Sequence, residues 1–160
     1  MARKKVPMTA AIRVLVKSGV EFSHHVYAYQ PRGGTQSSSQ ALGVEEHIVI
    51  KTIVMESADG RPFIVLMHGD LQVSARRLGR ALKLRDVRLC TPVVASRHTG
   101  YQVGGTSPFG TRKTLPIYVE ASILTLDKLY INGGRRGLLV SLTPEALSSI
   151  LQPIAVSCGV

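Results

Sequence analysis

The sequence predicts an α+β fold: a single domain with a mixed, curved, barrel-like sheet flanked by helices. The chain has 160 residues, of which 44% are hydrophobic and 19% charged, so it is long and apolar enough to bury a core. Helical and strand-like patterns interleave along it, but without the strict alternation of a parallel βαβ fold. We expect a basic N-terminal tail over residues 1–8 and one folded domain over residues 9–160.

Five segments carry helix signals. In the first, Ile12, Leu15 and Val16 recur at helical spacing between Thr9, a candidate N-cap, and Gly19, which follows the last turn. A second, brief helix is expected to have Ser37 as its cap and to end at Gly43. The other three begin at a hydroxyl cap, twice with proline at the first helical position, and are capped by Ser74, Thr91 and Thr143. They are expected to end at Leu82, Thr99 and Leu151.

Strand-like segments lie between these helices. Residues 22–27 form a short β-prone stretch, and residues 48–55 and 63–67 flank Asp59 and Gly60, which predicts a hairpin. Later strands are expected at residues 117–119, 129–131 and 138–142. Asn132 and Gly133 are expected to join the last two in a tight turn.

The composition excludes several classes of protein. No apolar run approaches the roughly 18 residues of a membrane span, and the N-terminus lacks the pattern of a signal peptide, so a cytoplasmic protein is expected. Cys90 and Cys158 have no CxxC partner, and the five histidines lack HxxxH or HExxH spacing. These spacings argue against a metal site. We expect neither a metal nor an organic cofactor. Cys90, which ends a short strand-like run, is expected to be a buried hydrophobic residue.

The charge balance points to a polyanionic partner. Twenty Lys and Arg against ten Asp and Glu give a net charge of +10, which suits a nucleic acid. Near Asp86 lies a cluster of basic residues: Arg76, Arg77, Arg80, Lys83, Arg85 and Arg88. A solvated helix face is the alternative interpretation. Because aromatic residues make up only 5% of the chain and Trp is absent, contact with the backbone of a folded RNA is favoured over base stacking.

Lys51 is the most anomalous residue, because it interrupts an almost continuous apolar run over residues 48–55. A buried ammonium group needs a lowered pKa, an anion or an opening onto a cleft. The alternative is a strand end or edge from which the side chain reaches water. Residues 104–110 form a glycine-rich loop whose N–H groups could face a carbonyl or oxyanion, or that is simply a demanding turn. No GxSxG motif and no Walker A loop is present.

Four motifs occur in order along the chain. They are Val49-Ile50-Lys51-Thr52, then TGYQVGGTSPFG over residues 99–110, then Leu115-Pro116, then YINGGRRGL over residues 130–138. In this combination they resemble the YbaK/EbsC family of aminoacyl-tRNA deacylases, relatives of the editing domain inserted in bacterial prolyl-tRNA synthetases. The likeness covers nearly the whole chain, and it implies the α+β editing-domain fold.

The resemblance also implies a function and a site. The chain would be a free-standing editing enzyme that cleaves the ester of mischarged tRNA(Pro), with cysteinyl-tRNA(Pro) as the leading substrate. In this family activity depends on the lysine that matches Lys51, and the tyrosine that matches Tyr27 lines the same pocket. Backbone groups of Gly104 and Gly105 would approach the aminoacyl carbonyl. The other substrate-binding residues that the motifs imply are Thr52, Ser107, Asn132 and Gly133.

The implied mechanism needs no protein nucleophile, since the substrate's own thiol attacks its ester and releases a cyclic thiolactone. The implied partner is tRNA, with prolyl-tRNA synthetase as a further candidate partner. This chain departs from the family pattern at Leu139, where an acidic residue is common, and at Asn132, where serine is common. Its segment between Tyr27 and Gly43 is also shorter. Alanyl-tRNA(Pro) therefore stays an alternative substrate, and a non-catalytic tRNA-binding module or a ligand-binding regulator an alternative function.

Overall fold

The structure, a computed structural model, describes residues 7–160, so most of the expected basic tail at residues 1–8 lies outside the described residues. Eight strands form one mixed sheet in the order β1-β7-β6-β2-β3-β5-β8, with β4 also pairing with β2. The strands are β1 (Ser23–Val26), β2 (Val49–Glu56), β3 (Pro62–His68), β4 (Arg88–Leu89), β5 (Ile117–Glu120), β6 (Leu129–Asn132), β7 (Leu138–Leu142) and β8 (Ile154–Val156). The end strands β1 and β8 do not pair with each other within residues 7–160, so the hydrogen-bonded path stays open.

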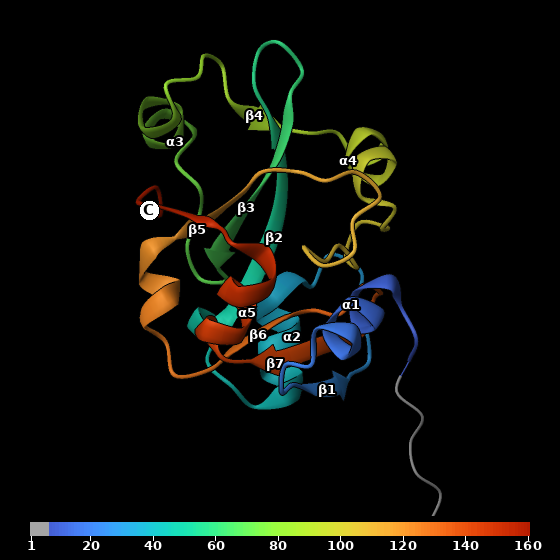
Figure 1. Ribbon diagram of the computed structural model, residues 1–160. Helices are drawn as coiled ribbons and strands as arrows, with labels where there is room; N and C mark the ends of the chain where they lie inside the picture. Colours follow the sequence, from blue (N-terminus) through green and yellow to red (C-terminus); the bar gives the residue numbers. More distant parts are fainter. Residues whose placement is uncertain (1–6) are drawn as a thin grey trace, which may run out of the picture.

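Helices flank this sheet, as the α+β expectation requires (Figure 1). They are α1 (Ala10–Ser18), α2 (Gly34–Leu42), α3 (Ala75–Leu82), α4 (Pro92–Thr99) and α5 (Pro144–Leu151), with short 3-10 turns η1 (Glu46–Ile48) and η2 (Ala121–Thr125). Figure 1 shows α3 and α4 on opposite sides of the hairpin that β2 and β3 form. Over residues 7–160, no helix combines the length and hydrophobicity of a membrane span.

The hydroxyl caps predicted from the sequence are confirmed for four of the five helices. The side chains of Thr9, Ser74, Thr91 and Thr143 each accept a hydrogen bond from the first turn that follows. The expectation for Ser37 is wrong, because α2 already starts at Gly34 and has no side-chain cap. The chain turns into the helix at Gly33, whose N–H donates to the Gln30 carbonyl (2.9 Å). Backbone conformation, not a capping side chain, therefore starts α2.

The hairpin between β6 and β7 is longer than expected. Asn132 still belongs to β6, where it pairs with Leu139, and the connection runs over residues 133–137. Gly134 and Gly137 have φ of 102° and 80°, so these glycines supply the left-handed conformations that the turn requires. The three-residue strand β8, parallel to β5, was not predicted, since its first two residues are exposed and carry no alternating pattern.

The two central strands are buried on both faces. Ile50, Val54, Ile64 and Leu66 belong to a core that includes residues of α1 and α5. Ile53 and Met55 of β2 and Phe63, Val65 and Met67 of β3 face the other way, into a second core that includes Leu78 of α3. This is the period of two expected of a strand. Lys51 is the one charged side chain of β2 that interrupts this double packing between its ends.

Thr9 ties α1 to the β6–β7 hairpin. Its hydroxyl accepts from the Ile12 N–H (3.0 Å) and donates to the Gly133 carbonyl (2.5 Å). We predict that Thr9→Ala lowers the free energy of unfolding in urea by about 1–2 kcal/mol, because both hydrogen bonds are lost. Thr9→Ser keeps the hydroxyl and serves as the control. Equal losses in the two variants would contradict this role of the hydroxyl.

Candidate active site

A cavity of about 750 Å³ opens along the edge of β2. All residues from Val49 to Val54 line it, as expected of a cavity that follows a strand edge rather than one face of a sheet. Its other walls come from the segment before α2, from α2, from the start of α4, from the glycine-rich loop and from the β6–β7 hairpin. The predicted site residues Tyr27, Lys51, Thr52, Gly104 and Asn132 all line this cavity.

The cavity lies where β2 lacks a neighbour on one side. On the edge of β2 that faces away from β3, β6 pairs with Val49 and Ile50, and β4 pairs with Met55 and Glu56. Within residues 7–160, no strand pairs with residues 51–54 on that edge. The sheet is therefore split at its centre, and the split opens the space that the side chains line.

The structure places Lys51 at this split, in the middle of the sheet and not at a strand end. Its ammonium group donates a hydrogen bond to the Leu71 carbonyl. Burial lowers the pKa of Lys51, while the charges of Glu46 and Asp70 act in the opposite direction. A lowered pKa and an opening onto a cleft are two of the three solutions that the sequence left open for a buried lysine.

The end of the cavity near β6 and β7 is apolar. Tyr27 packs against the buried cluster of Val49, Tyr130 and Leu139, and its N–H donates to the Gly137 carbonyl (2.9 Å). Burial raises the pKa of Tyr27, so its phenol is a neutral hydrogen-bond donor at neutral pH. This end suits a small side chain next to a polar group that carries no charge.

The glycine-rich loop is held against the β6–β7 hairpin. Asn132 donates from Nδ2 to the Gly104 carbonyl (3.1 Å) and accepts from the Gly134 N–H (2.7 Å). Arg136 donates from Nε to the Val103 carbonyl (2.9 Å) and lies over the Tyr29 ring at 5.1 Å. Tyr29 and Arg136 line the cavity but were missed from the sequence. Arg136 stands inside one of the motifs, which was the available signal.

Three predicted site residues do not line the cavity. Ser107 is fully buried and accepts from the Phe109 N–H (3.2 Å). A Cβ on Gly105 would meet the backbone of Arg135 at 2.8 Å, and one on Gly133 would meet the side chain of Leu138 at 2.9 Å. In this geometry the three residues shape the loops that carry Gly104 and Asn132.

The cavity lacks the usual parts of a hydrolase. Over the described range, no histidine, aspartate or glutamate lines it. The one thiol in its wall is Cys90, which is half-buried and not fully buried as expected from the sequence. Burial raises the pKa of Cys90 to about 11, so the thiolate that would act as a nucleophile is scarce at neutral pH. Chemistry here would therefore rest on Lys51, on neutral polar groups such as the Tyr27 phenol, on backbone groups and on the ligand itself.

Behind Lys51 lies a group formed by His47, His68 and Asp70, whose possible ligand atoms lie within 4.8 Å of one another. His68 already uses both ring nitrogens, with the His47 carbonyl and with Ser122 Oγ, each at 2.7 Å. The two imidazole rings are stacked 3.8 Å apart at an angle of 6°. Because parallel stacked rings do not direct their lone pairs to one point, this arrangement suits hydrogen bonding better than metal coordination.

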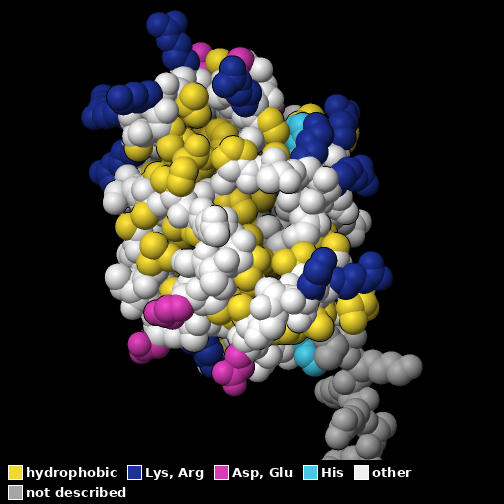
Figure 2. Space-filling view, viewed as in Figure 1, with side chains coloured by type: hydrophobic (Ala, Val, Ile, Leu, Met, Phe, Trp, Pro, Cys, Tyr) yellow, Lys and Arg dark blue, Asp and Glu magenta, His cyan; other side chains and the backbone are white. Residues whose placement is uncertain are grey.

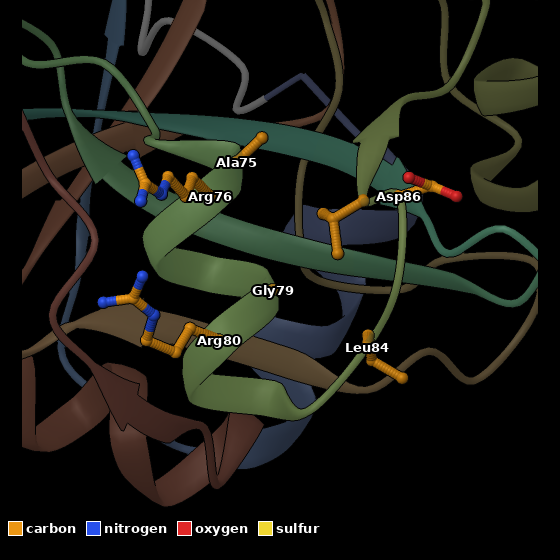
Figure 3. A pocket seen from close by; sticks show the side chains of 7 residues that line it. Ala75, Arg76, Gly79, Arg80, Leu84 and Asp86 are labelled. Atoms are coloured by element: carbon orange, nitrogen blue, oxygen red, sulfur yellow. The ribbon is translucent and has the colours of Figure 1, made fainter.

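Basic side chains gather at the end of the molecule that carries α3 and α4, and acidic ones at the opposite end and at a hairpin tip (Figure 2). A shallow pocket of about 270 Å³ lies on α3. Figure 3 shows Arg76 and Arg80 pointing to the same side of this helix, with Asp86 on the other side. Neither arginine forms a salt bridge within residues 7–160. Their charges are therefore available to a partner.

Comparisons with known proteins agree with this geometry. Residues 31–150, more than half of the chain, match the family model of the aminoacyl-tRNA editing domain. EbsC of Enterococcus faecalis, named as a candidate Cys-tRNA(Pro)/Cys-tRNA(Cys) deacylase, is 26% identical over 152 residues, 94% of this chain and 93% of that protein. A proline–tRNA ligase of Brachyspira hyodysenteriae is 28% identical over 86 residues, 54% of this chain and 15% of that enzyme.

The fold is also found among solved structures. A crystal structure described as a candidate trans-editing enzyme for prolyl-tRNA synthetase superposes with a TM-score of 0.80 at 22% identity, over 97% of this chain and 98% of that one. Fold, motifs and family model thus lead to the same assignment. The chain belongs to the aminoacyl-tRNA editing domain family, which confirms the deacylase class that its motifs predicted.

Proposed function

We propose that this protein cleaves the ester bond of tRNA(Pro) that carries a small wrong amino acid, with cysteine as the leading candidate. The observation that carries the proposal is Lys51, a half-buried cation in a cavity whose described lining holds no carboxylate. A cation without a fixed counter-ion favours a ligand on which negative charge develops. EbsC, whose match covers 94% of this chain, is named for the same class of substrate. We expect the protein in the cytoplasm, where charged tRNA is used.

In the proposed mechanism the substrate supplies the nucleophile. The cysteinyl sulfur attacks the carbonyl carbon of its own ester, a C–S bond forms and the C–O bond to the ribose breaks. The ribose oxygen leaves as a hydroxyl, with the proton that the thiol releases, and the amino acid leaves as a cyclic thiolactone. Lys51 and the backbone near Gly104 would stabilise the charge on the carbonyl oxygen. Holding the thiol close to the ester supplies the rest of the acceleration.

Alanine is the second candidate for the amino acid. Tyr27, Val49 and Leu139 make the cavity apolar at the end near β6 and β7, and such a wall accepts a methyl group as well as a thiol. An alanyl ester has no internal nucleophile, so its cleavage would need a water molecule placed by the cavity. The two substrates therefore separate the thiol-assisted mechanism from direct hydrolysis.

The first prediction concerns the substrate and Lys51. Purified protein is incubated with cysteinyl-, alanyl- and prolyl-tRNA(Pro), and loss of each ester is followed over time. We expect the cysteinyl ester to disappear selectively, and Lys51→Ala to slow its loss by about 100-fold or more, because the cation at the carbonyl is gone.

Two outcomes would change this assignment. Loss of the alanyl ester alone would keep the reaction and move the specificity to alanine. No hydrolysis of any ester, with tRNA still bound, would make the protein a tRNA-binding module instead.

The second prediction concerns pH. If Lys51 acts as a cation, the deacylation rate falls as pH rises through its pKa, which burial places below the ordinary value of 10.5. Glu46→Gln removes a charge that favours the cation. The fall in deacylation rate should therefore occur at lower pH in this variant. Glu145→Gln in α5 is the charge-matched control, and the pH at which its rate falls should equal that of the native protein. If the rate of Glu46→Gln falls at the same pH as that of the native protein, Lys51 does not act as a cation in the reaction.

The third prediction concerns tRNA binding by the α3 surface, defined as Arg76 and Arg80. Phosphate contacts release counterions, so affinity for tRNA should fall steeply between low and moderate salt. Alanine at both positions should reduce the slope of log Kd against log salt by about one unit per lost contact. The control replaces Arg13 and Lys17, two exposed basic residues of α1. A flat salt response in the native protein would instead favour recruitment through a synthetase.

A further inference from the structure

The split in the sheet exposes peptide groups of β2 as well as side chains. In an antiparallel pair, successive residues turn their N–H and C=O alternately toward the partner strand and away from it. At the end of the β2–β3 hairpin, the Ser57 N–H donates to the Arg61 carbonyl (3.2 Å). The peptide groups of Ser57 therefore face β3, and so do those of every second residue before it. Val54 faces away from β3, since its carbonyl accepts from the Cys90 N–H (3.0 Å). Thr52, two residues earlier, therefore turns both peptide groups to the same open edge.

Thr52 lacks partners on that edge. Strand β6 pairs only as far as Ile50, and β4 begins to pair at Met55. The hydroxyl oxygen of Thr52 is also buried without a hydrogen-bond partner among the described residues. Buried polar groups in proteins are nearly always paired. The Thr52 N–H and carbonyl thus stand side by side in the wall of the cavity, and neither has a hydrogen-bond partner among residues 7–160.

The surroundings of this edge are apolar on the side of β4 and α4. The walls there come from Val54, Leu89, Cys90, Pro92 and Ala95. Leu89 lines the cavity although it is 66% exposed, so the apolar wall continues to the mouth. Apolar walls next to one donor and one acceptor suit a nucleobase, because its faces are apolar and its edge forms hydrogen bonds.

We propose that the peptide edge of Thr52 binds the Watson–Crick edge of the adenine that ends every tRNA, with the Thr52 N–H donating to N1 and its carbonyl accepting from the N6 amino group. The inference rests on the proposed function. Lys51, Tyr27 and Gly104 lie toward the β6 end of the split, where the ester would sit. The base then occupies the β4 end, and the ribose spans the residues between.

The test compares deacylation of three substrates that differ in one atom of the terminal base: adenosine, 1-deazaadenosine and 7-deazaadenosine. Loss of N1 leaves the Thr52 N–H unpaired, so kcat/KM should fall roughly 10- to 100-fold with 1-deazaadenosine. The matched control, 7-deazaadenosine, keeps both groups of the Watson–Crick edge and should react like adenosine. Equal rates for all three would overturn the inference while the deacylase function stands. No reaction with any of them would count against the proposed function itself.

Variants of Thr52 locate the contact. Thr52→Val keeps the peptide group and should keep the preference for adenosine over 1-deazaadenosine. Thr52→Pro removes an N–H that the pairing with β3 does not use, and should abolish that preference. As a measurement independent of this variant's folding, the Thr52 amide resonance of the native protein is followed during titration with adenosine 5′-monophosphate. A shift there that 1-deazaadenosine 5′-monophosphate fails to produce supports the contact. Shifts confined to other amides would overturn it.

Discussion

The interrupted hydrogen-bond ladder on one edge of β2 is the constraint on which the site depends. A strand at the centre of a sheet ordinarily has a neighbour along each edge, because unpaired peptide groups removed from water lose their hydrogen bonds. Here β6 and β4 share one edge and leave residues 51–54 between them without a partner strand in the described part of the chain. The residues at this gap line the cavity, so backbone and side-chain groups of one strand can contact the same ligand.

The same gap makes a charged residue tolerable inside the sheet. The apolar residues Ile50, Ile53 and Val54 of β2 pack into one of two cores, and an ammonium group buried among them would lose its hydration. Lys51 avoids this loss because it opens onto the cavity and donates to the Leu71 carbonyl. Glu46 and Asp70 favour the cation without lining the cavity. Among the described lining residues the charged side chains are Arg32, Lys51 and Arg136. All three are cations, which suits an ester carbonyl that gains electrons in the transition state.

A second requirement, a rigid backbone in the wall of the cavity that Lys51 lines, is met by two loops that hydrogen-bond to each other. Asn132 and Arg136 of the β6–β7 hairpin hold the carbonyls of Gly104 and Val103. Donors that are already in place need no reorganisation during the reaction. The long hairpin connection, which differs from the expected tight turn, supplies Arg136, and Asn132 is the last residue of the strand before it. Its extra length thus has a role in the site.

Local signals in the sequence predicted most of the fold. Caps such as Thr9 and Ser74 act within one helical turn, and the alternation of β2 and β3 acts along a single strand, so each can be read from neighbouring residues. The prediction that Ser37 caps a helix was wrong because α2 already starts at Gly34, so Ser37 lies inside the helix. Strand β8 was not predicted from the sequence, because only its pairing with β5 defines it as a strand.

For the site, the sequence by itself determined the family, through ordered motifs, and it marked Lys51 as a charge out of place. Only the tertiary structure decided which motif residues share a cavity, since Ser107 turned out to be buried and Arg136 to line the wall. It also decided where β2 is left unpaired. The physical reason is that this gap depends on the register of β2 with β6 and β4, strands far from one another in the chain. No local propensity encodes such a register.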